Sequence, residues 1–214
     1  MSPLVDARWD PISVDAIANR FASFDVDWWV AGGRAIDLFL GWETRQHNDL
    51  DLEMFRSDRD ILFDVFAGWD FYTVSEGAFS KWERGAQIAP PVFGIWGRPT
   101  PNDPWAVEIM LADGDMTDGA AATWRFRRDN EISLSRSLLT ATSQTGIRYC
   151  IPEVQLLYKS KQSRPKDDVD MVRCLHRMTN SQRTWLADAI RRGDPVHSWI
   201  RLLESANSMQ TNDL

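Results

Sequence analysis

The most constraining feature of the chain is a short segment in which acidic and apolar residues alternate strictly. Residues 49–55 read Asp-Leu-Asp-Leu-Glu-Met-Phe, and this period of two predicts a half-buried β-strand. On such a strand Asp49 and Asp51 project from the same face. Two neighbouring carboxylates repel each other unless a cation compensates, and an oxygen-preferring divalent ion such as Mg²⁺ suits that role. A solvated strand face would show the same spacing, so spacing alone leaves both interpretations open.

A glycine pair lies upstream, between a second predicted strand and a predicted helix. Residues 27–31 are rich in aromatic and branched side chains, which favours a strand. Residues 34–40 have a helical pattern that Gly41 can terminate. Gly32 and Gly33 between them would let the backbone approach a phosphate, and the helix N-terminus adds N–H groups that bind anions. A tight turn without a ligand is the alternative interpretation.

The middle of the chain is strand-like and interrupted by glycine and proline. Its clearest strand is the segment 105–111, in which Glu108 is the only acidic residue. Segment 85–104 holds five of the ten prolines, so we expect long loops there, of the kind that often border an active site.

From Pro152 onward the sequence favours helices. Pro152 and Pro165 each stand where the first residue of a helix is expected. Typical domain sizes then predict an N-terminal α/β domain at residues 1–148, a C-terminal helical domain at 149–214, and a cleft between the two.

Charge and composition restrict the class of protein. The formal net charge is −7 and Lys and Arg form no long run, which argues against a nucleic-acid substrate. An acidic surface instead favours a cationic small molecule. No apolar segment is long enough for a transmembrane helix and the first residues do not form a secretory signal, so we expect a cytosolic protein without a membrane segment. Cys150 and Cys174 lack metal-binding spacing.

In combination, these motifs resemble the DNA-polymerase-β-like nucleotidyltransferases. The closest likeness is to the bacterial aminoglycoside-2''-adenylyltransferase and lincosamide nucleotidyltransferase family, whose pattern runs Gly-Gly, Asp-Leu, Thr-Arg-x-His-x-Asp-Leu/Ile-Asp. The later run 151–171, IPEVQLLYKSKQSRPKDDVDM, resembles the Pro-Glu, Lys and Pro-Lys-Asp-x-x-Asp segment of the family. The resemblance spans about residues 20–178 and is loose in the middle. Matching positions in the first pattern are Asp37, Thr44, Arg45, His47, Asp49 and Asp51.

The resemblance implies an α+β fold, with a small mixed β-sheet core flanked by helices and a C-terminal helical domain. It also implies one or two Mg²⁺ ions, with ATP or another nucleoside triphosphate as co-substrate. A third carboxylate from a neighbouring strand would complete the metal site and take the proton of the acceptor. Glu108 is the candidate, although many relatives carry Asp there, and Glu53 on the face of Asp51 competes for the role.

The resemblance also indicates the residues that bind the triphosphate. Gly32, Gly33 and Arg34 would meet the β- and γ-phosphates, although relatives often have an aromatic residue in place of Arg34. Arg45 and His47 would contact phosphate or hold the carboxylates in place. Two lysines lie on the helix predicted after Pro152: Lys159 is expected to reach the triphosphate across the cleft and Lys161 to face solvent.

The function that follows is transfer of a nucleoside monophosphate, AMP from ATP in particular, onto a hydroxyl of a small acceptor such as an aminoglycoside-like antibiotic. Antibiotic resistance is the expected role. Two alternatives stay open: a nucleotidyltransferase of toxin–antitoxin type that modifies a macromolecule, and a non-catalytic descendant that binds a nucleotide or a partner. The acceptor-binding residues and the oligomeric state are not predicted.

Overall fold

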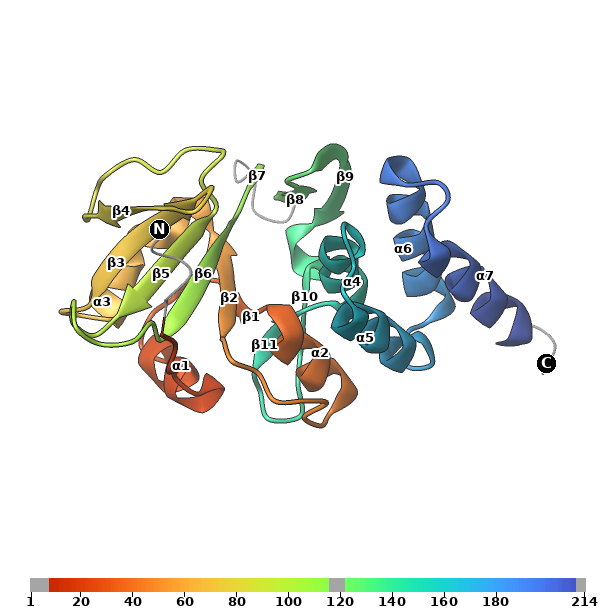
Figure 1. Cartoon of the computed structure of the whole chain (residues 1–214), viewed down its shortest axis with the longest axis horizontal. Helices are drawn as coiled ribbons and strands as arrows, with labels where there is room; N and C mark the ends of the chain where they lie inside the picture. Colours follow the sequence, from red (N-terminus) through yellow and green to blue (C-terminus); the bar gives the residue numbers. More distant parts are fainter. Residues whose placement is uncertain (1–7, 116–121, 211–214) are drawn as a thin grey trace.

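A mixed eight-stranded β-sheet is the main sheet of the computed structural model, which describes residues 8–115 and 122–210 (Figure 1). The strand order is β10-β11-β1-β2-β6-β5-β3-β4. A second sheet has the order β7-β8-β9. The strands are β1 (Trp28–Val30), β2 (Asp51–Phe55), β3 (Asp70–Ser75), β4 (Ala78–Trp82), β5 (Gly94–Arg98), β6 (Val107–Ala112), β7 (Gly114–Asp115), β8 (Thr123–Phe126), β9 (Asp129–Ser135), β10 (Thr140–Thr142) and β11 (Arg148–Cys150).

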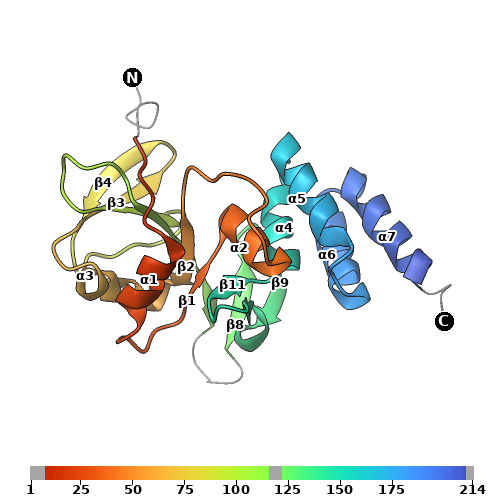
Figure 2. The same cartoon turned by 90° about the horizontal axis from the view of Figure 1, so that it is seen from below.

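Helices flank the sheet and form the whole C-terminal part of the described chain. Figures 1 and 2 show β3 and β4 at one end of the molecule and α6 and α7 at the other, with α2 between the central strands and α4 and α5. This arrangement confirms the predicted α+β fold class. The helices are α1 (Val14–Phe21), α2 (Gly32–Leu40), α3 (Leu62–Val65), α4 (Pro152–Ser160), α5 (Pro165–Leu175), α6 (Asn180–Gly193) and α7 (Ser198–Gln210), with 3₁₀ helices η1 (Arg56–Ile61) and η3 (Arg136–Leu138).

The central strands form because their aromatic and branched residues enter a continuous core. Trp29 and Val30 of β1 are almost fully buried, as are Leu52 and Met54 of β2. β1 pairs with β2 antiparallel and β2 pairs with β6 in parallel. β2 therefore lies inside the sheet with a partner on each side, so its register is fixed along its whole length.

The strand β2 is shorter than its sequence pattern predicts, because it begins at Asp51 and leaves Asp49 in the preceding loop. The physical reason is the end of β1. Val30 pairs with Leu52, and the last bond between the two segments is that from Ala31 N to Asp51 O, at 2.9 Å. After Ala31 the chain turns into α2 at Gly32, so no further residue of β1 is available to pair with Asp49.

The helix α2 begins two residues earlier than the pattern predicts, at Gly32. Gly32 has a φ of 63°, in the left-handed region that favours glycine. Gly41 ends the helix in the same region with a φ of 85°, and its N–H donates to Asp37 O at 2.8 Å. The predicted C-cap is thereby confirmed.

The C-terminal helices begin where the prolines predict, with Pro152 first in α4 and Pro165 first in α5. α4 packs against α2 and α6, so the helical part contacts the sheet-forming part through α2. The division into domains at residue 148 stays a prediction. Among the described helices, none combines the length and the apolar composition that a membrane span requires.

Candidate active site

Two carboxylates on neighbouring strands face each other at the start of β2. Asp51 of β2 is the register partner of Glu108 of β6, and both side chains are half-buried. Register partners in a sheet project to the same face, so the two carboxyl groups share one site. Asp49 is exposed in the loop immediately before and lines the same cavity as Asp51. The sequence prediction thus names three carboxylates that the structure brings to one end of β2.

The electrostatics of this group reflect burial and mutual repulsion. Burial raises the pKa of Asp51 to about 7, and the charges of Glu108 and Asp49 add to the rise. Burial likewise raises the pKa of Glu108, with the charge of Asp49 contributing. Each carboxylate would therefore be more stable beside a cation than it is alone.

Glu53, the competing third carboxylate, lies further along β2 and has a partner of its own. It is buried, and Trp29 Nε1 donates a hydrogen bond to its Oε2 at 3.0 Å. Burial raises the pKa of Glu53 to about 7, although the bond from Trp29 opposes the rise. The register partner of Glu53 on β6 is Met110, so the pairing brings no second carboxylate opposite it.

The glycine pair allows the acidic strand and its preceding loop to approach the start of α2. A Cβ atom at Gly32 would overlap the carboxylate of Asp51, and one at Gly33 would overlap Arg45 and His47. Both glycines line the cavity that contains Asp49 and Asp51. The two glycines therefore let the side chains of Asp51, Arg45 and His47 pack directly against the helix backbone.

A buried pair holds the loop between α2 and β2. His47 Nε2 lies 2.7 Å from Asp37 Oδ2, and Asp37 Oδ1 accepts from Thr44 N at 2.9 Å and from Thr44 Oγ1 at 2.6 Å. Burial lowers the pKa of His47, and the charge of Arg45 opposes its protonation further. The structure thus places His47 as a support of the loop, with its ring against Gly33.

A concentration of positive charge lies in a cavity of about 450 Å³ between α2, the loop before β2, and α4 and α5. Six cations and three carboxylates line it, together with both glycines. Such an excess of cations around a glycine-rich helix start suits a polyphosphate. The cations are Arg45, Arg128, Lys159, Lys161, Arg164 and Lys166, and the carboxylates are Asp49, Asp51 and Asp167.

Lys159 lines the cavity, at the place where the sequence predicts it. Two carboxylates of α5 also bind its ammonium group. Lys159 Nζ donates to Asp167 Oδ1 and to Asp170 Oδ2, each at 3.0 Å. Lys161, which was expected to face solvent, is exposed and also lines the cavity. The structure therefore brings both lysines to the place where the triphosphate is expected.

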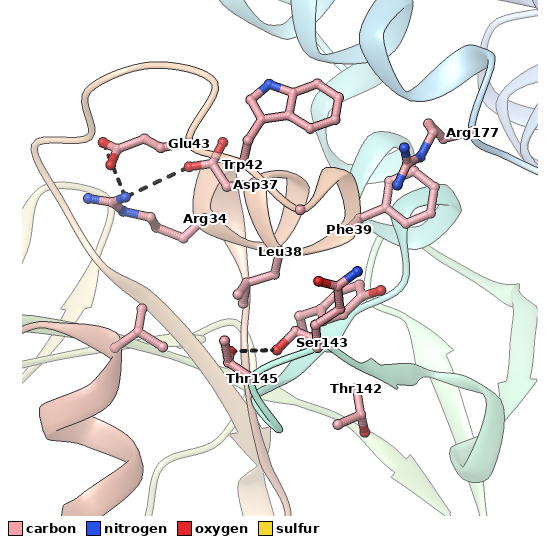
Figure 3. A pocket seen from close by; sticks show the side chains of 14 residues that line it. Arg34, Asp37, Leu38, Phe39, Trp42, Glu43, Thr142, Ser143, Thr145 and Arg177 are labelled. Atoms are coloured by element: carbon pink, nitrogen blue, oxygen red, sulfur yellow. Dashed lines mark hydrogen bonds and ion pairs between the residues drawn. The ribbon is translucent and has the colours of Figure 1, made fainter.

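Arg34 lies elsewhere than the phosphate contact predicted for it. Its guanidinium is 3.3 Å from Glu43 Oε1 and 3.8 Å from Asp37 Oδ2. Figure 3 shows it in a different pocket, of about 370 Å³, with Trp42 and Arg177. The side chain projects from α2 away from the cationic cavity because Gly33, one residue earlier, is the one that faces Arg45 and His47.

Several residues of the site were not predicted. Gln155 Oε1 accepts the Gly32 N–H at 2.8 Å and joins α4 to the glycine pair. Gln155 could have been found from the sequence, because it stands four residues before Lys159 and therefore on the same face of the predicted helix. Arg128 lies in the turn between β8 and β9, far away in the sequence, and only the fold could place it beside the cavity.

The donors at the start of β2 fit a magnesium ion. Asp49, Asp51 and Glu108 offer only oxygen ligands, and crowding makes each carboxylate more stable with a cation close by. Within residues 8–115 and 122–210, no three Asp, Glu, His or Cys side chains are already arranged around one point. Mg²⁺ commonly takes one or two carboxylates and completes its shell with phosphate oxygens and water.

The fold is similar to the folds of solved antibiotic nucleotidyltransferases. The crystal structure of ANT(2'')-Ia in complex with adenylyl-2''-tobramycin is 15% identical, with a TM-score of 0.52, and the alignment covers 84% of this chain and 95% of that one. The lincomycin-bound lincosamide antibiotic adenylyltransferase LnuA is 15% identical, with a TM-score of 0.50 and coverage of 77% and 97%. The solution structure of ANT(2'')-Ia gives 16% identity, a TM-score of 0.52 and coverage of 86% and 92%.

One family model matches the N-terminal part of the sequence. Residues 13–77 match the family model described as aminoglycoside-2''-adenylyltransferase. This segment contains the glycine pair and both aspartates of the acidic strand. The resemblance predicted from these motifs is thereby confirmed. Among curated proteins, no sequence matches the chain.

Proposed function

We propose that the chain is a Mg²⁺-dependent nucleotidyltransferase that moves AMP from ATP onto a hydroxyl of a small acceptor of the aminoglycoside-like antibiotic kind. One observation carries the proposal: the register pairing of Asp51 with Glu108 beside a cavity in which six cations face three carboxylates. Carboxylates suit a metal and a proton acceptor, while the cations suit a triphosphate. The family match supports the choice of ATP and of an antibiotic acceptor.

In the proposed reaction the acceptor hydroxyl oxygen attacks the α-phosphorus of ATP. A new P–O bond forms, the bond from the α-phosphorus to the oxygen that bridges to the β-phosphate breaks, and pyrophosphate leaves. The carboxylate of Glu108 takes the hydroxyl proton, for which its raised pKa is favourable. Mg²⁺ held by Asp49, Asp51 and Glu108 would neutralise charge on the phosphate oxygens.

The other residues of the cavity orient the triphosphate. Arg45 and Lys159 reach the cavity from two elements, the loop before β2 and α4, and both are suited to the β- and γ-phosphates. Gly32 and Gly33 keep the space beside Asp51 free of side chains. His47 acts through the loop, because its ring is buried and bonded to Asp37.

A smaller cavity next to Asp51 is the place that we propose for the acceptor. It has a volume of about 180 Å³ and shares Asp51 and Gln155 with the large cavity, and Glu53 and Arg127 also line it. A hydroxyl group bound in this cavity would lie beside Asp51, which we propose as a metal ligand. In-line displacement would require this hydroxyl to attack the α-phosphorus from the side opposite to the leaving pyrophosphate.

The test is pyrophosphate release from ATP and Mg²⁺ in the presence of a panel of aminoglycosides and lincosamides. We expect release with one acceptor class and a matching gain of one AMP in the mass of the acceptor. Asp51→Asn should lower kcat by at least about a hundredfold, because it removes a metal ligand. The matched control Glu131→Gln changes an exposed carboxylate on β9 and should leave kcat unchanged.

Each result has a distinct meaning. If no acceptor of the panel causes pyrophosphate release although MgATP binds tightly, the antibiotic acceptor is contradicted and a macromolecular acceptor becomes the next candidate. Absence of MgATP binding to the wild-type chain would contradict nucleotidyl transfer itself.

A further inference from the structure

Asp170 on α5 is a buried carboxylate placed between two cations of the proposed triphosphate cavity. The residue has no solvent exposure. Its Oδ2 accepts from Lys159 Nζ at 3.0 Å and lies 3.9 Å from a terminal nitrogen of Arg45. Lys159 belongs to α4 and Arg45 to the loop before β2, so one oxygen connects the two walls of the cavity.

The neighbouring carboxylate Asp167 has a different role. Its Oδ2 accepts from Arg164 N at 3.1 Å and from Arg164 Nε at 2.7 Å, which caps the start of α5. Asp170 stands in the second turn of the helix, beyond the backbone groups that a capping residue satisfies. Its Oδ1 has no hydrogen-bond partner in the described part of the chain. The known contacts of Asp170 therefore all run through Oδ2 to the two cations.

This arrangement controls how Lys159 meets a ligand. An ammonium group has three donors, and Asp167 and Asp170 occupy two of them. The lysine is thus held with one donor for the cavity, which its side chain lines. Lys159 and Arg45 both lie close to one oxygen of Asp170, so the two cations would repel each other, and the carboxylate offsets this repulsion. A buried carboxylate is itself stable only with such partners.

We infer that Asp170 is a positioning residue of the triphosphate site, which holds Lys159 directly and Arg45 more weakly so that both present their charges to the β- and γ-phosphates. The inference rests on the proposed function. Asp170 does not line the cavity and acts only through the two cations. Nothing in the proposed chemistry requires it to touch the nucleotide or the acceptor.

The experiment is a double-mutant cycle on MgATP affinity, measured by titration calorimetry on the full chain. The variants are Asp170→Asn, Lys159→Met and the combination of the two. We expect each single variant to weaken MgATP binding by about tenfold, and the double variant to bind within about twofold of Lys159→Met alone, because Asp170 acts through the lysine. A purely structural role of Asp170 would give independent, multiplying losses.

Asp168→Asn is the matched control on the same helix. Asp168 Oδ1 accepts from Trp199 Nε1 at 2.8 Å, outside the cavity, and asparagine retains that acceptor. MgATP affinity should therefore stay at the wild-type value. Thermal unfolding followed by circular dichroism shows whether each variant is folded. If Asp170→Asn alone does not fold, the double variant, which leaves no unpaired lysine, is compared with Lys159→Met directly.

The outcomes separate the inference from the proposed function. Wild-type affinity in Asp170→Asn, or a further loss of about tenfold in the double variant relative to Lys159→Met, would overturn the positioning role and leave nucleotidyl transfer intact. A wild-type chain that does not bind MgATP would overturn the proposed function, and the positioning role with it.

Discussion

At the scale of single residues, Asp51 shows how a site can oppose the stability of its own fold. Its carboxylate is half-buried between those of Asp49 and Glu108, and it fills the space that a side chain at position 32 would need. Burial and like charges make the ionised group costly in the metal-free protein. The position is therefore better explained by ligand binding than by stability.

We predict that Asp51→Asn has opposite effects on activity and on stability. Asparagine keeps the shape that fits against Gly32 and removes the charge. In EDTA at pH 8 the melting temperature of the variant should exceed that of the wild type by a few degrees, in line with a gain on the order of 1 kcal/mol, while nucleotidyl transfer is lost. Differential scanning calorimetry measures the first effect. A lower melting temperature would show that the carboxylate stabilises the fold.

At the scale of elements, one carboxylate joins three segments of the chain beside the central strand β1. Asp27, just before β1, accepts from Arg136 of η3 at 2.8 Å and from Arg148 of β11 at 2.5 Å. β1 and β11 are parallel neighbours separated by more than a hundred residues in the chain. The ion pairs therefore hold a non-local strand pairing next to the start of α2.

The pKa of Asp27 gives a pH-dependent test of this connection. Partial burial alone would raise the pKa, but the hydrogen bonds and charges of Arg148 and Arg136 lower it below its usual range. A carboxylate with a lowered native pKa contributes stability above its unfolded pKa of about 4, and this contribution is lost as pH falls through the native value. Asp27→Asn should lower the melting temperature at pH 7 by about 2–4 °C.

The melting temperature of Asp27→Asn should depend less on pH than that of the wild type. Between pH 7 and pH 3 the difference in melting temperature is expected to shrink, because the wild type loses the Asp27 contribution over the lower part of that range. A difference that stays constant with pH would mean that packing, not charge, explains the effect of the substitution.

At the scale of the whole molecule, the sequence predicted what depends on local pattern. The strand and helix around Gly32, the start of α4 at Pro152 and the α+β class are all consequences of neighbouring residues. The resemblance then indicated Glu108, which lies opposite Asp51. What could not be predicted depends on pairing between distant segments. The place where β2 begins follows from the end of β1, and the contribution of Arg128 follows from the packing of a distant turn.

The distribution of charge over the molecule leads to a prediction about salt. The chain has a net charge of −7, yet six of its 24 Lys and Arg residues line one cavity. Screening by salt weakens attraction between exposed charges. MgATP affinity should therefore fall several-fold between about 50 and 500 mM KCl, as measured by titration calorimetry. Arg191→Gln, which changes a cation of an exposed ion pair with Glu204, is the control and should show the same slope. Affinity independent of salt would contradict an electrostatic binding site.

The overlap between position 32 and the carboxylate of Asp51 also limits the order in which such a chain can evolve. While the aspartate is present, any side chain at position 32 collides with it, and the left-handed backbone there penalises a replacement further. A lineage that abandons catalysis must therefore lose the aspartate before the glycine. Related chains should include some that keep the glycine without the aspartate, and none that keep the aspartate without the glycine.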